Sequence, residues 1–190
     1  MTNFTKAAIK ASFLKLLNEM PLSKISVRSI TEDCGINRNS FYYHYQDIPA
    51  LIEEIVKDEV DTLIATYPTI TNLNECVDVA FRFALKNKKA VLHIYNSVNR
   101  DIYERSIMQL CEYTVSAYLD TAFGKNAVSE YDRAVAVRFF KCELFGLTFE
   151  WIENGMKDDA IEEIYHVIDR CRGLSEDLIR RSLEEQKNDA

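Results

Sequence analysis

The sequence predicts an all-α protein in which an N-terminal helix-turn-helix domain is followed by a helical bundle. Glycine and proline are scarce, with five and three residues in a chain of 190, whereas a strand-rich chain would need more turns. Hydrophobic residues recur at helical spacing along most of the chain, and no segment shows the convincing alternation of a strand. A short glycine-containing turn, Cys34-Gly35-Ile36-Asn37, joins two short helical segments.

The first expected element is an amphipathic helix from about Thr5 to Glu19, which Pro21 stops. Ser26 is a good N-cap for a short second helix that reaches Cys34. Gly35 follows and can take the positive φ of a helix end. The turn of the predicted motif therefore begins at this glycine.

Asn37 caps the next short helix, which reaches about Tyr45. Two helices of about two turns with a glycine turn between them are what a helix-turn-helix requires. Asp47 is an N-cap for a longer helix that has Pro49 in its first turn and continues to about Thr66. We therefore expect residues 1–48 to form the helix-turn-helix domain and residues 49–67 a connecting helix.

The rest of the chain, residues 68–190, is expected to form a second helical domain. Pro68 and a Thr- and Asn-rich segment mark the boundary, and Asn- and Gly-containing breaks separate the segments that follow. The expected amphipathic helices are 75–87, 89–98, 101–123, 130–154 and 159–172, with a final helix from the cap at 174–177 to about Glu185.

The charge of the chain is unevenly distributed. The formal net charge is -7, so no global basic field indicates a nucleic-acid partner. Residues 1–48 nevertheless hold six Lys and Arg against four Asp and Glu, whereas residues 49–190 hold 17 against 26. Any such partner must therefore meet a local patch in the N-terminal quarter. The chain has no apolar signal core and no long apolar run, so we expect a cytoplasmic protein without a membrane partner.

The cysteines do not indicate a metal site. They are odd in number, widely spread and without a Cys-x-x-Cys pair, which favours small core residues. We expect no metal and no cofactor. The five cysteines are Cys34, Cys76, Cys111, Cys142 and Cys171.

The densest polar and aromatic cluster covers residues 37–45. A helix in the major groove needs short polar or bidentate side chains on its first turn and donors near its ends for phosphates. Phe41 and Tyr45, four residues apart, are expected to be internal and to face Ile30 and Ile36. The candidate DNA-contact residues are Ser26, Arg28, Asn37, Arg38, Asn39, Ser40, Tyr42, Tyr43 and His44.

An ordinary aromatic core stripe would also explain the run from Tyr42 to Tyr45. Two observations favour DNA contact. Four consecutive aromatic residues cover every face of a helix, so one or two must be exposed, and the cluster lies in the net-positive segment. A metal or catalytic role for His44 is disfavoured because no Cys, second His or suitably spaced acid is near it in the sequence.

Over about residues 5–56 the sequence resembles the TetR family of one-component transcriptional regulators. The resemblance is carried by the first helix and by three segments, Ile25-Ser26-Val27-Arg28-Ser29-Ile30, Cys34-Gly35-Ile36-Asn37 and Ser40-Phe41-Tyr42-Tyr43-His44-Tyr45, followed by Leu51. It implies a homodimer that reads a palindromic DNA operator, and a variable domain at 68–190 that binds a small-molecule effector and dimerises.

The chain departs from the family pattern at two positions. Asp47 stands where many members have a Lys that touches phosphate, and Thr31 replaces a usual Ala. The segment from Asn37 to Asp47 is similar to a subset of the family that includes regulators of dihydroxyacetone kinase, some of which are activators. Repression is the expected mode, and activation remains an alternative.

The segment 134–152 is too apolar to be covered by one domain core, because it carries only four charged residues. Gly146 in its middle costs about 1 kcal/mol relative to Ala, which is understandable if another helix approaches closely there. Together with the apolar stripe on 159–172, two copies can form a four-helix interface. The expected dimer-interface residues are Phe145, Gly146, Phe149, Ile164 and Ile168.

A pocket with apolar walls and a few hydroxyl groups is expected among the aromatic residues of the second domain. A solid core remains the alternative for the same side chains. The candidate ligand-binding residues are His93, Tyr95, Tyr103, Tyr113 and Phe140.

These patterns favour a ligand-responsive DNA-binding transcriptional regulator over two other classes. One is a co-regulator or activator of the same fold that acts mainly through a protein partner. Asp47 and the negative net charge of the chain favour this class. The other is an enzyme, which we do not expect because the sequence has no Gly-rich phosphate loop, paired-carboxylate signature or nucleophile elbow.

Overall fold

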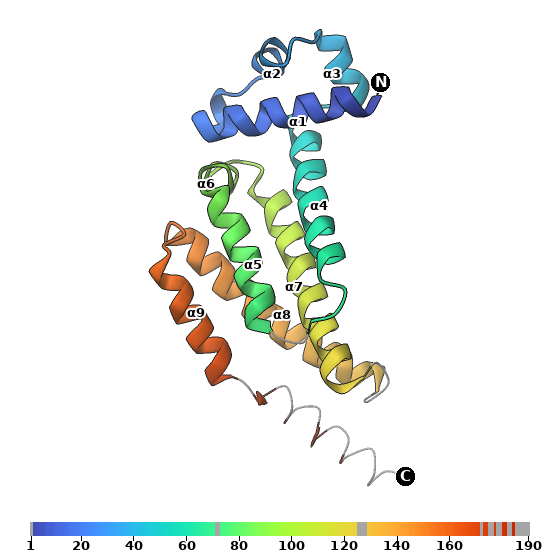
Figure 1. The fold of residues 1–190 in the computed structure, drawn as a ribbon, viewed down its shortest axis with the longest axis vertical. Coiled ribbons are helices and arrows are strands. Elements are labelled where there is room, and N and C mark those ends of the chain that lie inside the picture. Colours follow the sequence, from blue (N-terminus) through green and yellow to red (C-terminus); the bar gives the residue numbers. More distant parts are fainter. Residues whose placement is uncertain are drawn as a thin grey trace. The chain divides into compact units, whose positions relative to one another are not determined.

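The computed structural model describes residues 2–70, 73–124 and 129–171, together with positions 173, 174, 177, 180, 181 and 184. Over these residues the fold is all-α, as the sequence predicts, and it contains no strand (Figure 1). The chain divides into two units. The N-terminal unit comprises Met1–Thr62 and Ala84–Ser106, and the C-terminal unit comprises Leu63–Phe83 and Ile107–Ala190.

The helices that contribute to the N-terminal unit each begin and end within a few residues of their predicted bounds. A 3-10 turn at Leu22–Lys24 lies between the first two helices, directly after Pro21, which was predicted to stop the first helix. The unit contains all of α1 (Thr2–Glu19), α2 (Val27–Asp33), α3 (Arg38–His44) and α6 (Lys88–Tyr95), most of α4 (Ile48–Thr66), the end of α5 (Leu73–Lys86) and the start of α7 (Arg100–Phe123).

The core of the N-terminal unit is built from the apolar stripes that the sequence indicates. Each of the helices α1 to α4 contributes at least one large, fully buried side chain. The short helices α2 and α3 are therefore stabilised by packing against the rest of the unit, because helices of this length are not stable alone. The largest fully buried side chains here are Ile9, Phe13, Leu17, Ile30, Phe41, Leu51 and Ile52.

Helix α6 belongs to the N-terminal unit rather than to the second domain in which the sequence places it. Its His93 Nδ1 lies 2.6 Å from the carbonyl oxygen of Leu17, near the C-terminal end of α1. The last carbonyls of a helix have no partner within the helix, so a side chain from elsewhere can bond to them. This contact joins segments 76 residues apart, which local sequence patterns do not reveal.

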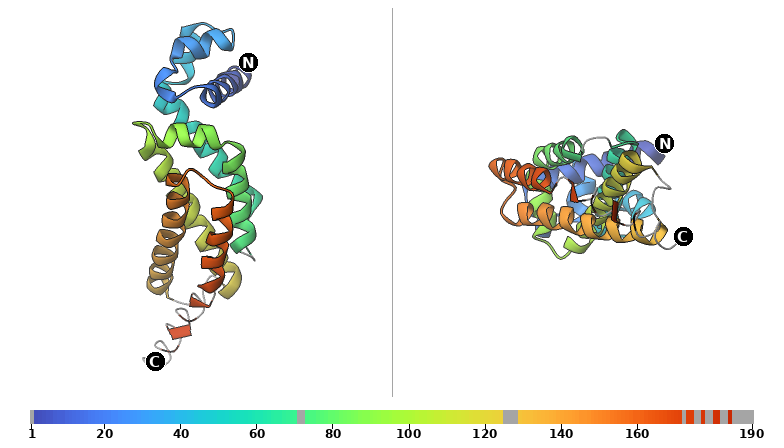
Figure 2. Two further views of the ribbon diagram at one scale, coloured as in Figure 1. Left: turned by 90° about the vertical axis from the view of Figure 1, so that its left-hand side faces the viewer. Right: turned by 90° about the horizontal axis from the view of Figure 1, so that it is seen from below.

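The C-terminal unit contains parts of α5 (Leu73–Lys86) and α7 (Arg100–Phe123), with α8 (Glu130–Glu153) and α9 (Asp159–Arg170). The chain reverses direction between α8 and α9 (Figure 2). Trp151 anchors this reversal, because its ring stacks on Phe81 at 4.6 Å and its Nε1–H donates to the Lys157 carbonyl at 2.8 Å. Gly155, with φ +81°, provides the positive φ that the turn requires.

The cysteines meet the expectation of a core position only in part. Cys111 is buried, and Cys34 and Cys171 are half-buried. Cys142 is exposed, because it lies on the outward face of α8, so the prediction was wrong for this residue. The side chain of Cys76 and most of the predicted helix at 174–185 lie outside the described residues.

Candidate nucleic-acid interface

Helices α2 and α3 form the predicted helix-turn-helix, and reciprocal hydrogen bonds cap the start of α2. The Ser29 N–H donates to Ser26 Oγ at 3.1 Å, and the Ser26 N–H donates to Ser29 Oγ at 2.9 Å. This capping box satisfies two backbone donors that would otherwise lack partners. The sequence indicated the Ser26 cap but not the contribution of Ser29.

The turn between the two helices has the hydrogen bonding of a Schellman motif. Gly35 has φ +70°, and the Ile36 N–H donates to the Thr31 carbonyl at 3.0 Å. Asn37 then caps α3, because its Oδ1 accepts from the Ser40 N–H at 2.8 Å and lies 3.1 Å from the Ser40 hydroxyl. The predicted turn and caps are therefore confirmed.

The two faces of α3 differ sharply in exposure. Phe41 is fully buried and Tyr45 is 3% exposed, as the sequence predicts, whereas Tyr42 and Tyr43 are 56% and 77% exposed. The Tyr42 and Phe41 rings pack edge to face with their centroids 5.6 Å apart, so the exposed ring is held against a buried one. Of the run from Tyr42 to Tyr45, the core-stripe alternative therefore holds for Tyr45 alone, because Tyr42 and Tyr43 are exposed and His44 is half-buried.

The structure gives different surroundings to the nine candidate DNA-contact residues. Arg38 and Asn39 are exposed, and the structure records no partner for either side chain among the residues it describes. Arg28 is exposed but bonded to Glu32 at 2.6 Å, and His44 is half-buried with its ring 5.0 Å from Tyr43. The side-chain oxygens of Ser26, Asn37 and Ser40 are already engaged in capping. Their contact with DNA stays a prediction.

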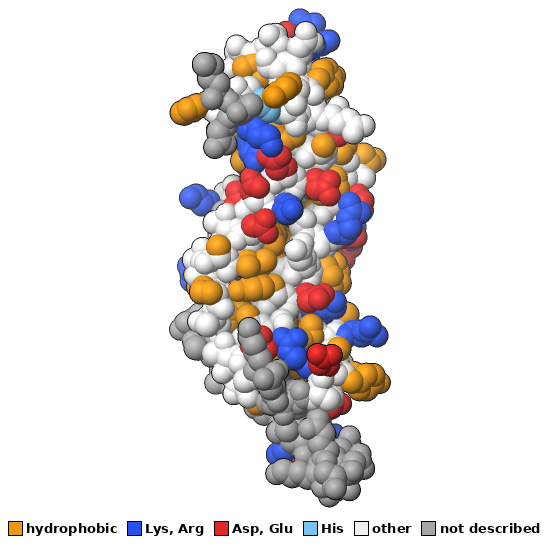
Figure 3. Space-filling view, turned by 90° about the vertical axis from the view of Figure 1, so that its right-hand side faces the viewer, with side chains coloured by type: hydrophobic (Ala, Val, Ile, Leu, Met, Phe, Trp, Pro, Cys, Tyr) orange, Lys and Arg blue, Asp and Glu red, His pale blue; other side chains and the backbone are white. Residues whose placement is uncertain are grey.

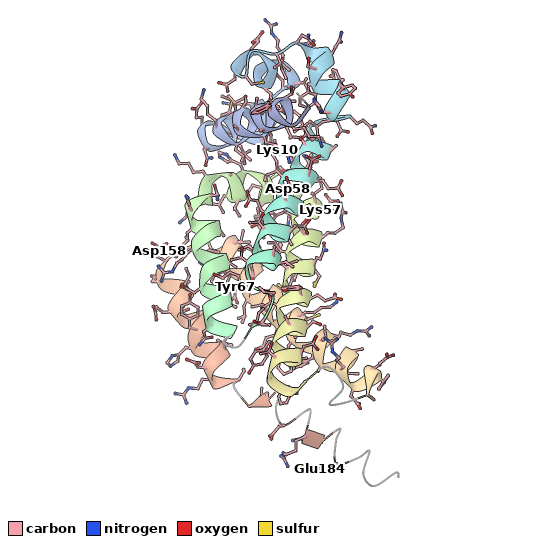
Figure 4. All side chains as sticks on the ribbon, turned by 45° about the vertical axis from the view of Figure 1, so that its right-hand side comes forward. Lys10, Lys57, Asp58, Tyr67, Asp158 and Glu184 are labelled. Carbon is pink, nitrogen blue, oxygen red and sulfur yellow. The ribbon has the colours of Figure 1, made fainter. Side chains whose placement is uncertain are left out.

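Most of the basic side chains in residues 1–48 form ion pairs with acidic side chains of the same chain. Lys15 bonds Asp33 at 2.6 Å, and Lys6 and Lys10 bond Glu54 at 2.8 and 2.7 Å. Figure 4 shows Lys10 pointing toward Asp58, with which it also pairs. Figure 3 shows acidic and basic side chains interspersed over one face of the molecule. Within the described part of the chain, Lys24 and Arg38 are the basic residues of this segment without an ion pair.

Asp47, the main departure from the family pattern, has a structural role. Its Oδ1 accepts a hydrogen bond from the Ala50 N–H at 2.8 Å, which caps the start of α4. This cap was predicted from the sequence. An aspartate here stabilises the helix start, so its presence has a reason that does not involve DNA.

The five candidate ligand-binding residues do not converge on one site within either unit. His93, Tyr95 and Tyr103 lie in the N-terminal unit, where both tyrosines are buried, while Tyr113 and Phe140 lie in the C-terminal unit. Burial raises the pKa of Tyr103. A pocket of about 20 Å³, room for about one water molecule, contains Tyr113 alone of the five. Its lining residues are Leu63, Ile64, Tyr67, Ala80, Leu110, Tyr113 and Thr114.

Tyr113 also fastens the last turn of α4. Its hydroxyl lies 2.9 Å from the carbonyl oxygen of Tyr67 and 3.3 Å from that of Ile64, and these carbonyls lie at or just beyond the helix end. Tyr67, labelled in Figure 4, lines the same pocket. Tyr113 therefore both lines the pocket and bonds the end of α4 through its hydroxyl group.

The candidate dimer residues are unequally exposed in the single chain. Phe149 and Ile164 are buried, and Phe145 and Ile168 are half-buried. Phe145 and Phe149 stack at 4.3 Å. Gly146 is exposed, and a Cβ built on it would have no atom within 4 Å. Among the described residues, therefore, no other helix approaches Gly146 closely.

Helix α8 also carries an exposed apolar row that was not predicted from the sequence, where the expected interface on this helix lay at residues 145–149. Tyr131, Val135 and Phe139 are 78%, 44% and 57% exposed, and each is four residues from the next. Cys142 and Gly146, both exposed, continue the same face at helical spacing. We refer to these five residues as the α8 row. The i, i+4 spacing was the sequence signal for it, but only the fold separates this face from the buried one.

Comparison with known proteins supports a regulatory family. Residues 71–173, more than half of the chain, match the TetR family described as "Transcriptional regulator C-terminal region". No curated protein sequence matches the chain. No described helix is long and apolar enough to cross a membrane.

Two solved structures have similar folds at low sequence identity. The structure of "Dihydroxyacetone kinase operon activator DhaS" has a TM-score of 0.71 and 18% identity over 94% of this chain and 97% of the other. A TetR transcriptional regulator from Rhodococcus sp. RHA1 has a TM-score of 0.60 and 12% identity, over 90% of this chain and 98% of the other. At these identities the likeness shows the fold, while the match over 71–173 shows the family. The chain belongs to the TetR family of transcriptional regulators.

Proposed function

We propose that the protein is a ligand-responsive DNA-binding regulator that recognises a palindromic operator as a homodimer and represses transcription. The observation that carries this proposal is the exposed polar and aromatic face of α3, backed by the fully buried Phe41. Arg38 and Asn39 suit base edges on the first turn of a helix in the major groove. Tyr42 and Tyr43 offer hydroxyl donors for phosphate oxygens.

The operator contact is expected to depend on few cations. With most basic side chains of residues 1–48 already paired, Arg38 and Lys24 are the cations of this described segment that have no ion pair and are available for phosphate or base contacts. The slope of log affinity against log salt scales with the number of phosphates neutralised. We therefore expect a salt dependence of about four charges for a dimer, with neutral donors supplying the remaining contacts.

The test begins with selection of a duplex from a randomised DNA library by the wild-type protein. Fluorescence anisotropy then measures the affinity for that duplex in wild type, Arg38→Ala and Lys89→Ala. Lys89→Ala removes the same charge from an exposed position on α6, a helix that is not part of the helix-turn-helix, and is the control. Arg38→Ala is expected to weaken binding by about tenfold or more, while Lys89→Ala changes it by less than about twofold. Failure of the folded wild type to enrich any duplex at low salt would reject DNA recognition.

An activator that works mainly through a protein partner is the second candidate. It is favoured by the neutralised charge of the N-terminal segment and by the likeness of the fold to that of an operon activator, DhaS. Transcription from a template carrying the selected duplex, with and without the protein, separates repression from activation. Activation that persists in Arg38→Ala would select the partner-dependent function.

Dimerisation is proposed to use the α8 row, because an apolar row gains free energy when a second apolar surface covers it. A second copy also explains Gly146, since a crossing helix from the partner would meet bare backbone there. The half-buried Phe145 and Ile168 then lie at the margin of the interface. The buried Phe149 and Ile164 support it from the core of each chain.

The effector site is proposed to be the pocket beside Tyr113, enlarged when a ligand enters. Its walls are apolar, so a mainly apolar ligand with one polar group for the Tyr113 hydroxyl fits the lining. A ligand that takes this hydroxyl removes its bond to the end of α4. Tyr113→Phe is expected to abolish the response of DNA affinity to any effector found by thermal-shift screening. It should leave the affinity without effector unchanged within about twofold.

A further inference from the structure

Glu54, which the sequence reasoning did not single out, joins α4 to both α1 and the end of α3. Its carboxylate lies 2.8 Å from Lys6 Nζ and 2.7 Å from Lys10 Nζ, and it accepts a hydrogen bond from the Tyr45 hydroxyl at 3.1 Å. The Lys6 ammonium also stands over the Tyr45 ring at 5.4 Å. One carboxylate therefore organises three side chains from two other segments.

The protonation states in this cluster are well defined near neutral pH. Burial alone would raise the pKa of Glu54, but the hydrogen bonds from Lys10, Lys6 and Tyr45 together lower it to about 2. Burial and then the hydrogen bond to this carboxylate raise the pKa of Tyr45. Near neutral pH the Glu54 carboxylate is thus the acceptor and the Tyr45 hydroxyl the donor of this hydrogen bond.

Tyr45 controls the end of the recognition helix. Its N–H donates to the Phe41 carbonyl at 2.9 Å, which closes α3, and its ring lies 5.8 Å from the Phe41 ring. With only seven residues, α3 is too short to hold its own conformation and depends on such contacts. Asn37 fixes the start of α3, Phe41 fixes the middle, and the bond from Tyr45 to Glu54 fixes the end.

We propose that Glu54 is a positioning residue for DNA recognition: it holds Tyr45, and through it the exposed face of α3, in the orientation that presents Arg38 and Asn39 to base edges. This inference rests on the proposed DNA-binding function. Glu54 itself does not contact DNA. The role is one of geometry, because small misplacements of a recognition group remove the directional hydrogen bonds that distinguish one base from another.

A purely electrostatic role for Glu54 predicts the opposite result. If the carboxylate only neutralised the lysines, its removal would raise the net charge near the DNA-binding helices by one unit and leave Lys6 without its carboxylate, while Lys10 keeps its pair with Asp58. Affinity for any DNA would then rise, with a steeper salt dependence. The two roles therefore differ in sign and in sequence selectivity.

Three variants separate these roles. Glu54→Gln removes the charge and keeps the size of the side chain. Tyr45→Phe removes only the hydroxyl and leaves both lysine pairs of Glu54 in place. Glu53→Gln makes the same charge change at the exposed neighbouring residue and is the control.

Two measurements are made on each full-length variant. Anisotropy gives the affinity for the duplex selected by wild type and for a scrambled duplex of the same length and composition. Amide hydrogen exchange over residues 37–46, without DNA, reports how firmly α3 is held. Hydrogen exchange is measured without DNA, so it tests the role of Glu54 separately from the proposed DNA-binding function.

We expect Glu54→Gln and Tyr45→Phe to lose about tenfold in affinity for the selected duplex while Tyr45→Phe keeps its affinity for the scrambled duplex. Exchange over residues 37–46 is expected to rise in both variants and to stay unchanged in Glu53→Gln. Unchanged exchange in both variants would overturn the proposal, as would faster exchange with undiminished selectivity for the selected duplex. If wild type binds no duplex, the proposed function fails, and unchanged exchange would then also remove the structural role of Glu54.

Discussion

Helices α3 and α8 both expose aromatic side chains, but the neighbours of those side chains differ. On α3, Tyr42 and Tyr43 stand beside the polar Asn39, whereas on α8 Tyr131 and Phe139 belong to a row with few polar members. A polar and aromatic face suits a hydrated, charged partner, while an apolar row is stabilised only by another apolar surface. Exposure of an aromatic residue therefore indicates a partner, and its neighbours indicate which kind.

The two helices also differ in what holds them. Helix α3 has seven residues and depends on Phe41, on the Asn37 cap and on the bond from Tyr45 to Glu54. Helix α8 has 24 residues and is buried along one side at Leu144 and Trp151. Single changes should therefore have global effects on α3 and local effects on α8.

The largest effect is expected for the buried side of α3. Phe41→Ala should lower the free energy of unfolding of the N-terminal unit by about 3 to 5 kcal/mol, because a fully buried ring is replaced by a cavity. Tyr42→Ala, at an exposed position, should change it by less than about 1 kcal/mol. Denaturant titration followed by circular dichroism measures both. Equal destabilisation by the two substitutions would mean that the faces of α3 are assigned wrongly.

The next effect concerns the α8 row. Phe139→Asp should weaken dimerisation by about 2 to 4 kcal/mol, because it places a charge in an apolar contact, and should leave the stability of the chain unchanged. Val98→Asp, at a residue that is 95% exposed in the loop before α7, is the control. Sedimentation equilibrium compares the two. Wild type that is monomeric at micromolar concentration would move the dimer interface away from α8 or remove it.

Gly146→Leu sharpens the same comparison. Apart from the backbone of α8 itself and the adjacent residues, no atom of the described residues lies within 4 Å of a Cβ at this position, so the larger side chain has room within one chain. Loss of the dimer, by about 1 to 3 kcal/mol, is therefore expected only if a partner helix crosses there. Analytical sedimentation should show this loss while the melting profile stays unchanged, and an unaffected dimer would place the crossing elsewhere on α8.

A smaller effect is expected from the caps of the two helices. The Asn37 and Ser129 side chains each accept a backbone N–H at the start of their helix, at 2.8 and 3.1 Å. Replacing either by Ala should cost about 1 kcal/mol in the free energy of unfolding. Only Asn37→Ala should also reduce affinity for the selected duplex, because α3 is too short to absorb the loss. Equal affinity in both variants would show that α3 is held without its cap.

The smallest effect is expected in acid. The pKa of Glu54 falls from an ordinary value of 4.5 to about 2 in the folded chain. Its contribution to stability is then complete above pH 4.5 and is lost as the pH falls toward 2. Because its partners are partly exposed, each ion pair is worth about 0 to 1 kcal/mol. The difference in unfolding free energy between wild type and Glu54→Gln should shrink over this interval, and a constant difference would contradict the assigned pKa.

Local sequence determined the helix-turn-helix. Ser26, Gly35, Asn37 and Asp47 act through hydrogen bonds and backbone angles that involve residues within a few positions, so their types and spacing predict the caps and the turn directly. The burial of Phe41 and Tyr45 followed in the same way from their spacing on one helix. These features need no knowledge of the rest of the chain.

Tertiary structure alone decided the features that depend on distant residues. Glu54 meets Lys6 across 48 positions, His93 meets Leu17 across 76, and no local pattern specifies either contact. The same holds for the α8 row, because the sequence showed that this helix is too apolar for one core to cover but not which of its residues the core covers. Spacing fixes the faces of a helix, whereas packing against distant segments decides which face stays exposed and which charges are neutralised.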